Sequence, residues 1–432
     1  MKNKLSAGEK EQLQKNNFIL YLLGRFVSDT GTSMQMMIMP LYIIDAGGSA
    51  STVGLFSFLS LVPVLIVYPF AGVLGDRHNR KTIMVVTDFV SAGVILGLGL
   101  ISYLNVMSLT LLMSVQVMVS LLNGLFDPAT RGMLPQLVKS DKLTRANSIV
   151  ASLKTVSLML GPVIGAVMYA NFSVTILFLI NGISFFLSGT SEMMIRYTHN
   201  KLKTAVGMRG IITDLSEGIR FILAKKSIRK LCYFFMVTYL FVQPAFNVVL
   251  PVFFKTRLEY SDTQYGYLQS ILILGMLLGS ILVGTVFSKK DNVLKPLKSG
   301  TGLLLINMLL FSALMFPYSI SALGGGSISY FVLLAVVLCL LSASLMLINI
   351  PVQTFIQRET PDEYMSRVFS LVSMISRGGM PFGALLFGIV LERIEAHWSV
   401  LAATLLMIVV SIVFLTTFSG NQKYKFLFKE SE

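Results

Sequence analysis

Charged residues are scarce in this sequence. Asp, Glu, Lys and Arg together make up 13% of its 432 residues, whereas a soluble domain carries about 25%. Hydrophobic residues make up 54%, and a soluble protein of this length has too little interior to hide that much apolar surface. The composition therefore excludes a water-soluble globular protein and predicts an integral membrane protein whose main partner is the lipid bilayer.

Cysteine and histidine are nearly absent. The two cysteines, Cys232 and Cys339, each stand within an apolar run, and neither has another metal ligand at a typical spacing. We therefore expect no disulfide framework and no metal site. The sequence also shows no nucleotide-binding P-loop and no catalytic constellation, so it indicates neither an enzyme, nor a cofactor, nor ATP-driven pumping.

Long apolar runs dominate the chain. A helix needs about 20 apolar residues to cross the hydrocarbon core of a bilayer, and twelve such runs can be placed. Six lie near 17–45, 50–74, 82–104, 107–127, 143–170 and 173–194, and six near 229–254, 263–287, 293–318, 328–352, 365–391 and 396–418. The sequence thus predicts an all-α membrane protein with six-helix bundles at 17–194 and 229–418 and polar tails at 1–16 and 419–432.

A polar stretch at 195–228 separates the two predicted bundles. Its Ile211, Leu215, Ile219 and Ile222 recur at helical spacing. This pattern predicts a linker with an amphipathic helix that lies on the membrane surface.

Acidic residues are far fewer than basic ones, 21 against 35, which gives a net charge of +14. With the N-terminus inside, three basic residues fall on the outer side, namely Lys255, Arg257 and Arg393, and three fall within spans, namely Arg25, Lys154 and Arg377. All the others lie in the tails, in inner loops or at nearby helix ends. The positive-inside rule therefore predicts a multi-pass protein of the cytoplasmic membrane with both termini in the cytoplasm, and the placement argues against a nucleic-acid partner.

The two halves share sequence features. Gly54 of the second span corresponds to Gly266 of the eighth, and the segments 141–148 and 363–370 share an acid-x3-Arg-x2-Ser pattern. Chance explains a matching glycine more easily than it explains the longer pattern. Repeats of six helices are typical of transporters with a substrate site between the halves, so we expect the bundles to be related by pseudo-two-fold symmetry.

Charges within the predicted spans point to a site. Arg25 and Asp29 stand four residues apart, so they share a helix face and can pair. Lys154 and Arg377 also lie deep in their spans. An unpaired charge at that depth costs at least about 2.5 kcal/mol, so such residues normally face a partner or a cavity. Because Asp29 is the only clearly deep acid, the expected cavity is locally positive and would admit an anionic or polar group.

Asp29 has two possible roles. A partly desolvated carboxyl beside an arginine can be charged or neutral during a transport cycle, so Asp29 could carry a proton while Arg25 tunes it. The alternative is a permanent structural ion pair.

The loop after the second span reads Gly72-Val-Leu-Gly-Asp76-Arg77-His-Asn79-Arg-Lys. This closely resembles the signature of the major facilitator superfamily, except that Asn79 stands where Gly is usual. Asn tolerates the left-handed backbone of a tight turn, so the loop is expected to survive. The resemblance implies the fold of that superfamily and a latch on the cytoplasmic gate. The latch residues would be Gly72, Asp76, Arg77, Arg80, Asp88, Asp127 and Arg131, with Asp127 or Asp88 as a partner of Arg77.

A second motif lies in the fifth span. Ser157, Gly161, Pro162 and Gly165 resemble the Gly-x3-Gly-Pro-x2-Gly motif of antiporters in the same superfamily, with Ser157 in place of the first glycine. Small residues four apart also let helix backbones approach closely, so ordinary helix packing is the alternative interpretation.

Within the superfamily, the chain resembles the bacterial macrolide-efflux and enterobactin-exporter branch of drug:proton antiporters, through stretches such as 126–129 and 217–221. The resemblance implies a monomeric secondary active transporter that uses the proton gradient to export small amphipathic compounds, macrolide-like drugs among them, by alternating access. Multidrug efflux and antibiotic resistance would follow. Two other functions stay open: a dedicated carrier of a metabolite, siderophore or lysophospholipid, and a transporter-like sensor that does not transport.

Overall fold

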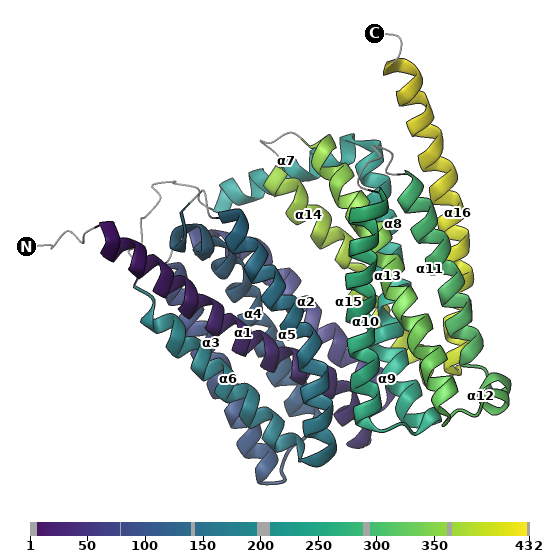
Figure 1. Cartoon of the computed structure of the whole chain (residues 1–432), viewed down its shortest axis with the longest axis horizontal. Coiled ribbons are helices and arrows are strands. Elements are labelled where there is room, and N and C mark those ends of the chain that lie inside the picture. The colour runs from purple at the N-terminus through teal and green to yellow at the C-terminus, as the bar shows by residue number, and fades with distance from the viewer. Residues whose placement is uncertain are drawn as a thin grey trace, which may run out of the picture. The chain divides into compact units, whose positions relative to one another are not determined.

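Helices make up the regular structure of the described part of the chain (Figure 1). The computed structural model describes residues 7–77, 79–139, 143–196, 208–287, 294–360 and 365–429. The first half contains α1 (Ala7–Asp45), α2 (Ala50–Arg77), α3 (Arg80–Tyr103), α4 (Leu109–Leu137), α5 (Leu143–Asn171) and α6 (Val174–Met194).

The second half begins with α7 (Met208–Ala224), α8 (Lys226–Pro244), the π-helical η2 (Ala245–Val249), α9 (Leu250–Phe253) and the π-helical η3 (Phe254–Leu258). Next come α10 (Asp262–Leu282), the π-helical η4 (Val283–Phe287), α11 (Leu294–Leu314) and α12 (Pro317–Leu323). The last helices are α13 (Ile328–Glu359), α14 (Met365–Arg377), α15 (Gly379–Leu391) and α16 (Ala396–Lys429).

The chain forms two compact units. The first consists of Met1–Ala46, Leu59–Ala205 and Ser261–Tyr267, and the second of Gly47–Phe58, Val206–Tyr260 and Leu268–Glu432. The first unit therefore holds α1, α3 to α6, most of α2 and the start of α10, while the second holds the start of α2 and the remaining helices.

Eleven helical stretches among the described residues are long and apolar enough to cross a membrane. The long α1 is not one of them, because polar residues such as Asp29, Thr30 and Gln35 interrupt its apolar sequence. Within the first unit α1 contacts α4, α5 and α6. Its polar side chains can therefore be satisfied by other helices, which explains why hydropathy alone does not detect this helix.

Two glycines of α5 let it approach α1 closely. A Cβ atom on Gly161 would lie 2.5 Å from Cβ of Ser33, and one on Gly165 would lie 2.8 Å from Cγ of Met34. Both distances are shorter than real carbon contacts, so these positions need glycine. The spacing that resembles an antiporter motif thus forms a helix contact, as the packing interpretation expects.

Helices α3 and α6 run side by side in opposite directions. Gly99 of α3 lies against Leu179, and Gly182 of α6 lies against Leu96. Near the other end of the pair, Nζ of Lys81 donates to the carbonyl oxygen of Met193 at 2.7 Å. This register places residues 84–88 of α3 beside the last two turns of α6.

In the second unit, a single helical rod extends from Lys226 to Leu258. Pro244 lacks an N–H group, and its ring displaces a carbonyl one turn earlier. The five residues that follow it form the wider π-helix η2. On α15, Gly379 and Gly383 face the backbone carbonyls of Met236 and Leu240, so α15 packs directly on this rod.

Several helix boundaries differ from the sequence predictions. The fourth helix was expected to end near residue 127, but α4 continues to Leu137 through Pro128 and Pro135. A proline inside a membrane helix is tolerated where neighbouring helices satisfy the freed backbone groups. The eleventh predicted span consists of two helices, α14 and α15, that meet at Gly378.

The predicted linker helix is present as α7, which packs on α8 and α14. Ile222 is buried and Ile219 is exposed, whereas the side chains of Ile211 and Leu215 lie outside the described residues. A position of α7 on the membrane surface remains a prediction.

Asn79 does not form the expected left-handed turn. Its backbone is extended, with φ −64° and ψ 112°, and it caps α3. Its side-chain oxygen accepts a hydrogen bond from the backbone N–H of Lys81 at 3.0 Å. Asn is among the preferred N-cap residues, so helix capping, and not tolerance of positive φ, explains an asparagine here.

The contact between α5 and α1 can be tested with two matched alanine substitutions. Gly161→Ala places a Cβ against Ser33 and the backbone of Met34, and overpacking of this kind costs about 1–3 kcal/mol. Gly97→Ala adds the same methyl group to α3, at a position where no atom beyond the helix's own backbone lies within 4 Å of the added Cβ. We expect Gly161→Ala, but not Gly97→Ala, to lower the thermal unfolding midpoint of the purified protein by several degrees. Equal midpoints for the two variants would contradict this packing.

Candidate functional site

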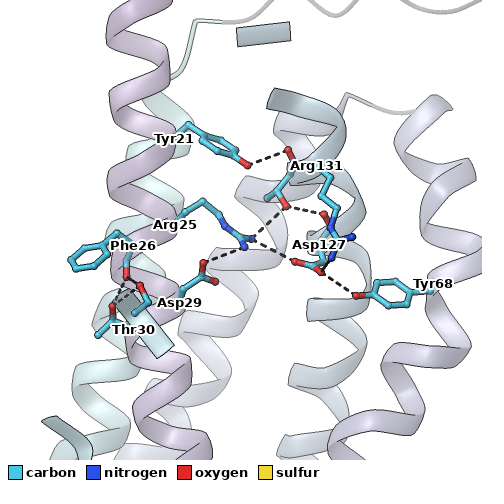
Figure 2. Close-up of polar contacts among 10 residues, drawn as sticks. Tyr21, Arg25, Phe26, Asp29, Thr30, Tyr68, Asp127 and Arg131 are labelled. Atoms are coloured by element: carbon cyan, nitrogen blue, oxygen red, sulfur yellow. Dashed lines mark hydrogen bonds and ion pairs between the residues drawn. The ribbon is translucent and has the colours of Figure 1, made fainter. Parts of the chain in front are cut away.

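A buried arginine on α1 forms the centre of a polar cluster in the first unit (Figure 2). The guanidinium of Arg25 pairs with the carboxylate of Asp29, one turn further along the helix, at 3.2 Å. The side chain of Arg25 is 9% exposed and that of Asp29 is 24% exposed. The ion pair predicted from the four-residue spacing is therefore present, and Asp29 retains some access to solvent.

A second carboxylate reaches the same arginine from α4. Oδ1 of Asp127 lies 3.8 Å from Nη1 of Arg25. The other carboxylate oxygen accepts hydrogen bonds from the phenol of Tyr68 and the guanidinium of Arg131, each at 3.0 Å. Figure 2 shows that Asp127 points toward both arginines, so it connects α1, α2 and α4. Asp127 thus lies within the Arg25 cluster.

Two further contacts hold Arg25 in place. Nη1 lies 3.4 Å from the hydroxyl oxygen of Thr130, and the guanidinium carbon lies 5.2 Å from the ring centre of Phe126, a cation–π distance. The phenol of Tyr21 donates to the carbonyl oxygen of Thr130 at 3.3 Å. Tyr21 and Phe126 also belong to an apolar core with Met133 and Leu134, which fixes the helices that carry the charges.

A cavity of about 150 Å³ adjoins the cluster. Its lining combines charged, polar and aromatic side chains, namely Arg25, Ser28, Asp29, Thr32, Val64, Tyr68, Asn123, Phe126, Asp127 and Phe185. Pockets for drug-sized ligands are about 300–1,000 Å³ and mostly apolar, whereas this cavity is smaller and mainly polar. The cluster is therefore a candidate surface for water or for the polar part of a larger substrate.

The buried charges of this unit include more acids than Asp29. Asp127 shares Arg25, and both Asp88 and Glu192 are buried. Lys154 is exposed, although it lies close enough to act electrostatically on Asp29 and Asp127. Among the described residues of this unit the buried charges are thus mainly acidic, while a locally positive cavity that also includes Lys154 and Arg377 remains a prediction.

Arg377 belongs to the second unit. Its side chain is exposed at the end of α14, and it acts electrostatically on Tyr239, whose phenol donates to Oδ1 of Asn349 at 3.2 Å. Grouping Arg377 with Arg25, Asp29 and Lys154 in one cavity remains a prediction.

The predicted antiporter-like residues connect α5 to α1 beside the cluster. Ser157 is fully buried, and its hydroxyl lies 3.0 Å from that of Thr30 and donates to the carbonyl oxygen of Phe26 at 3.3 Å. Gly161 and Gly165 continue the same contact, and Pro162 lies inside α5. These residues hold α1, and therefore Arg25 and Asp29, against α5.

Part of the predicted gate motif lies outside the described residues. The side chains of Gly72, Asp76 and Arg77 are not described, although the backbone of α2 continues to Arg77. Nη1 of Arg80 donates to the carbonyl oxygen of Gly132 at 2.6 Å, which joins the start of α3 to α4. Asp88 is buried on α3. A pairing of Arg77 with Asp127 or Asp88 remains a prediction.

Sequence reasoning missed that Asp127 pairs with Arg25. Expecting the fourth span to end at 127 left the carboxyl at a helix end, whereas α4 continues for ten more residues. The four-residue spacing of Asp127 and Arg131 is a helical signal that could have shown this. The contributions of Tyr68 and Thr130 depend on helix packing and have no signal in the local sequence.

Eleven stretches of the described residues that are long and apolar enough to cross a membrane define a multi-pass membrane protein. Residues 21–384 match the Major Facilitator Superfamily, and the chain belongs to that family of secondary transporters. It is therefore a transporter and not an enzyme.

Relatives and solved structures agree with this assignment. Macrolide efflux protein A of Streptococcus pyogenes is 25% identical over 92% of this chain and 95% of its own length. The Multi-drug resistance efflux pump PmrA homolog of Lactococcus lactis subsp. lactis is 23% identical over 95% and 96%. The crystal structure of the nucleoside transporter NupG superimposes with a TM-score of 0.73 at 12% identity, covering 94% of this chain and 99% of that one. This last likeness supports the fold alone.

The role of Arg25 as the shared cation can be tested by stability. Arg25→Met leaves Asp29 and Asp127 without their buried partner, which we expect to destabilise the protein by about 3 kcal/mol. This lies at the low end for a broken buried pair, because each carboxylate is about a quarter exposed. Adding Asp29→Asn to Arg25→Met should recover part of the loss.

Arg131→Met is the control, because Arg131 contacts the same Asp127 but is 74% exposed. Exposed pairs contribute about 0–1 kcal/mol, so its thermal unfolding midpoint should stay near that of the wild type. An Arg25→Met variant as stable as Arg131→Met would show that the cluster does not depend on Arg25.

Proposed function

We propose that this transporter exports small amphipathic compounds, macrolide-like drugs among them, in exchange for protons by alternating access. The observation that carries the proposal is the sharing of Arg25 between Asp29 and Asp127 at the edge of a cavity. The names of the relatives, a macrolide efflux protein and a multidrug efflux pump, support the choice of substrates and the direction of transport.

The coupling follows from the geometry of the shared arginine. Asp29 lies 3.2 Å from Arg25 and Asp127 lies 3.8 Å from it, so a small displacement of the guanidinium exchanges the nearer partner. When Asp29 accepts a proton, Arg25 keeps Asp127 as its counterion. When Asp29 loses the proton, the pair with Arg25 forms again. Protonation of one carboxyl therefore changes the charge and the lining of the cavity together.

The cavity, at about 150 Å³, has room for the polar end of an amphiphile. Phe126, Phe185 and Val64 offer apolar contact, while Asn123 and Thr32 offer hydrogen-bonding groups. A bound compound that occupies the space beside Asp29 changes the access of that carboxyl to water. Proton and substrate would then influence one another through a single site.

The remaining features of the proposal concern topology and gating. Both termini lie in the cytoplasm in this proposal, because that orientation places nearly all 35 Lys and Arg residues on the inner side. The segment from Gly72 to Lys81 acts as the cytoplasmic latch. The bond between Arg80 and Gly132 supports this role, since it joins the start of α3, directly after the loop, to α4, the helix that carries Asp127. The transporter works as a monomer in the cytoplasmic membrane.

Asp29→Asn tests the coupling directly. The assay measures efflux of a macrolide and of a fluorescent amphiphilic dye from an efflux-deficient bacterium, with and without a protonophore. Wild-type efflux should be abolished by the protonophore. Asp29→Asn should lose gradient-driven efflux while keeping exchange of labelled for unlabelled substrate in vesicles, because its cavity is intact.

Asp45→Asn is the matched control, since Asp45 also lies on α1 but accepts a hydrogen bond from Tyr169 away from the cluster. This variant should keep gradient-driven efflux. Full gradient-driven efflux by Asp29→Asn would reject Asp29 as the proton carrier. If the wild type changes neither drug susceptibility nor dye accumulation, a dedicated carrier or a sensor becomes the better assignment.

A further inference from the structure

Two more carboxyls lie on the contact between α3 and α6, away from the wall of the cavity. A Cβ atom on Gly189 of α6 would lie 3.3 Å from Cβ of Asp88, so Asp88 directly faces that position. Glu192 lies one turn further along α6. The antiparallel register of α3 and α6 places it beside the same stretch of α3. Asp88 is 2% exposed and Glu192 is 0% exposed.

Three of the four oxygens of these carboxyls lack a hydrogen-bond partner within the described part of the chain. Oδ2 of Asp88 and both carboxyl oxygens of Glu192 are buried without one, and Ser188 is the neighbour whose hydroxyl acts on Asp88. A buried ionised carboxylate costs several kcal/mol unless it is paired and hydrogen-bonded. Gly189 has no side chain and that of Ser188 is short, so the space between α3 and α6 at this point is available to the side chains of Asp88 and Glu192.

The charged groups that face the pair come from α1 and α3. Arg25 and Asp29 of α1 act electrostatically on Asp88, and Arg25 also acts on Glu192. Tyr21 of α1 interacts with Glu192 as well. On α3, Lys81 bonds the backbone oxygen of Met193, the residue after Glu192.

Arg25 cannot neutralise both carboxyls, because it already pairs with Asp29 and lies near Asp127. In the described part of this unit, four acids therefore share one buried cation, Arg25, while Lys154 and Arg131 are exposed. Two carboxylates in direct interaction titrate as a pair, and the negative charge of one disfavours the charge of the other.

We propose that Asp88 and Glu192 form a second proton-binding site, on the contact of α3 with α6, which exchanges its proton with solvent and interacts with the Arg25 cluster. Its part in transport rests on the proposed proton coupling. When Asp29 gains or loses a proton, the net charge around Arg25 changes, and the pair can respond because Arg25 acts on both of its carboxyls. Binding of the proton itself needs no substrate.

Infrared spectroscopy of the purified transporter, titrated with pH in the absence of substrate, tests the site. A protonated carboxyl has a carbonyl stretch that an ionised carboxylate lacks. The wild type should show this band at neutral pH and lose it as the pH rises. The double variant Asp88→Asn/Glu192→Gln should lack the neutral-pH band, and each single variant should move its titration midpoint.

Glu395→Gln is the control, because Glu395 is an exposed glutamate that pairs with Arg257 at 2.8 Å. It should leave the neutral-pH band unchanged. Asn and Gln resemble the neutral acids in shape, so the variants should fold with a wild-type elution profile. A variant that fails to fold at neutral pH would show that an ionised carboxylate is required at that position.

Two results would overturn the site: a neutral-pH band that the double variant retains in an Asp29→Asn background, and a band that does not change with pH while the protein stays folded. The test is independent of the function proposed above. Failure of gradient-driven efflux would leave the band in place, and absence of the band would leave Asp29-dependent efflux in place.

Discussion

Among the described residues of the first unit, one buried cation organises the polar contacts, the guanidinium of Arg25. Arg25 cannot be left unpaired inside a membrane protein, and the helices around it supply what it needs: Asp29 from its own helix, Asp127 and Thr130 from α4, and the ring of Phe126. Close packing holds these helices at the required distance, because glycines on α5 let that helix contact α1 directly. The functional cluster and the helix packing are therefore parts of one arrangement.

The sequence was sufficient for the architecture and for the ion pair within α1. Apolar runs of about 20 residues indicate membrane helices whatever surrounds them, and a four-residue spacing places two side chains on one helix face. Both signals are local. The hydropathy of α1 is low for a membrane-spanning helix, because Asp29 and Gln35 lower it. Other helices pack around these polar side chains, and a local hydropathy signal does not detect such packing.

The parts that could not be predicted depend on contacts between distant segments. Asp127 reaches Arg25 only because α4 continues past Pro128, whereas the apolar run predicted a helix end near residue 127. Asn79 was interpreted through its tolerance of positive φ, whereas the fold uses its ability to cap α3. Glu192 lies near the end of the predicted sixth span, and only the packing of α6 shows that it is completely buried. The spacing of residues along the sequence does not show which acidic side chains share one arginine in the folded protein.

Through Asp29 and Arg25, binding of the proton and binding of the substrate depend on one another in the proposed mechanism. The most direct test is the number of protons that the purified transporter releases when a macrolide such as erythromycin binds, measured with a pH indicator in weak buffer. We expect release by the wild type and by Asp45→Asn, and none by Asp29→Asn despite retained binding. Equal proton release by the wild type and Asp29→Asn would contradict the proposed coupling.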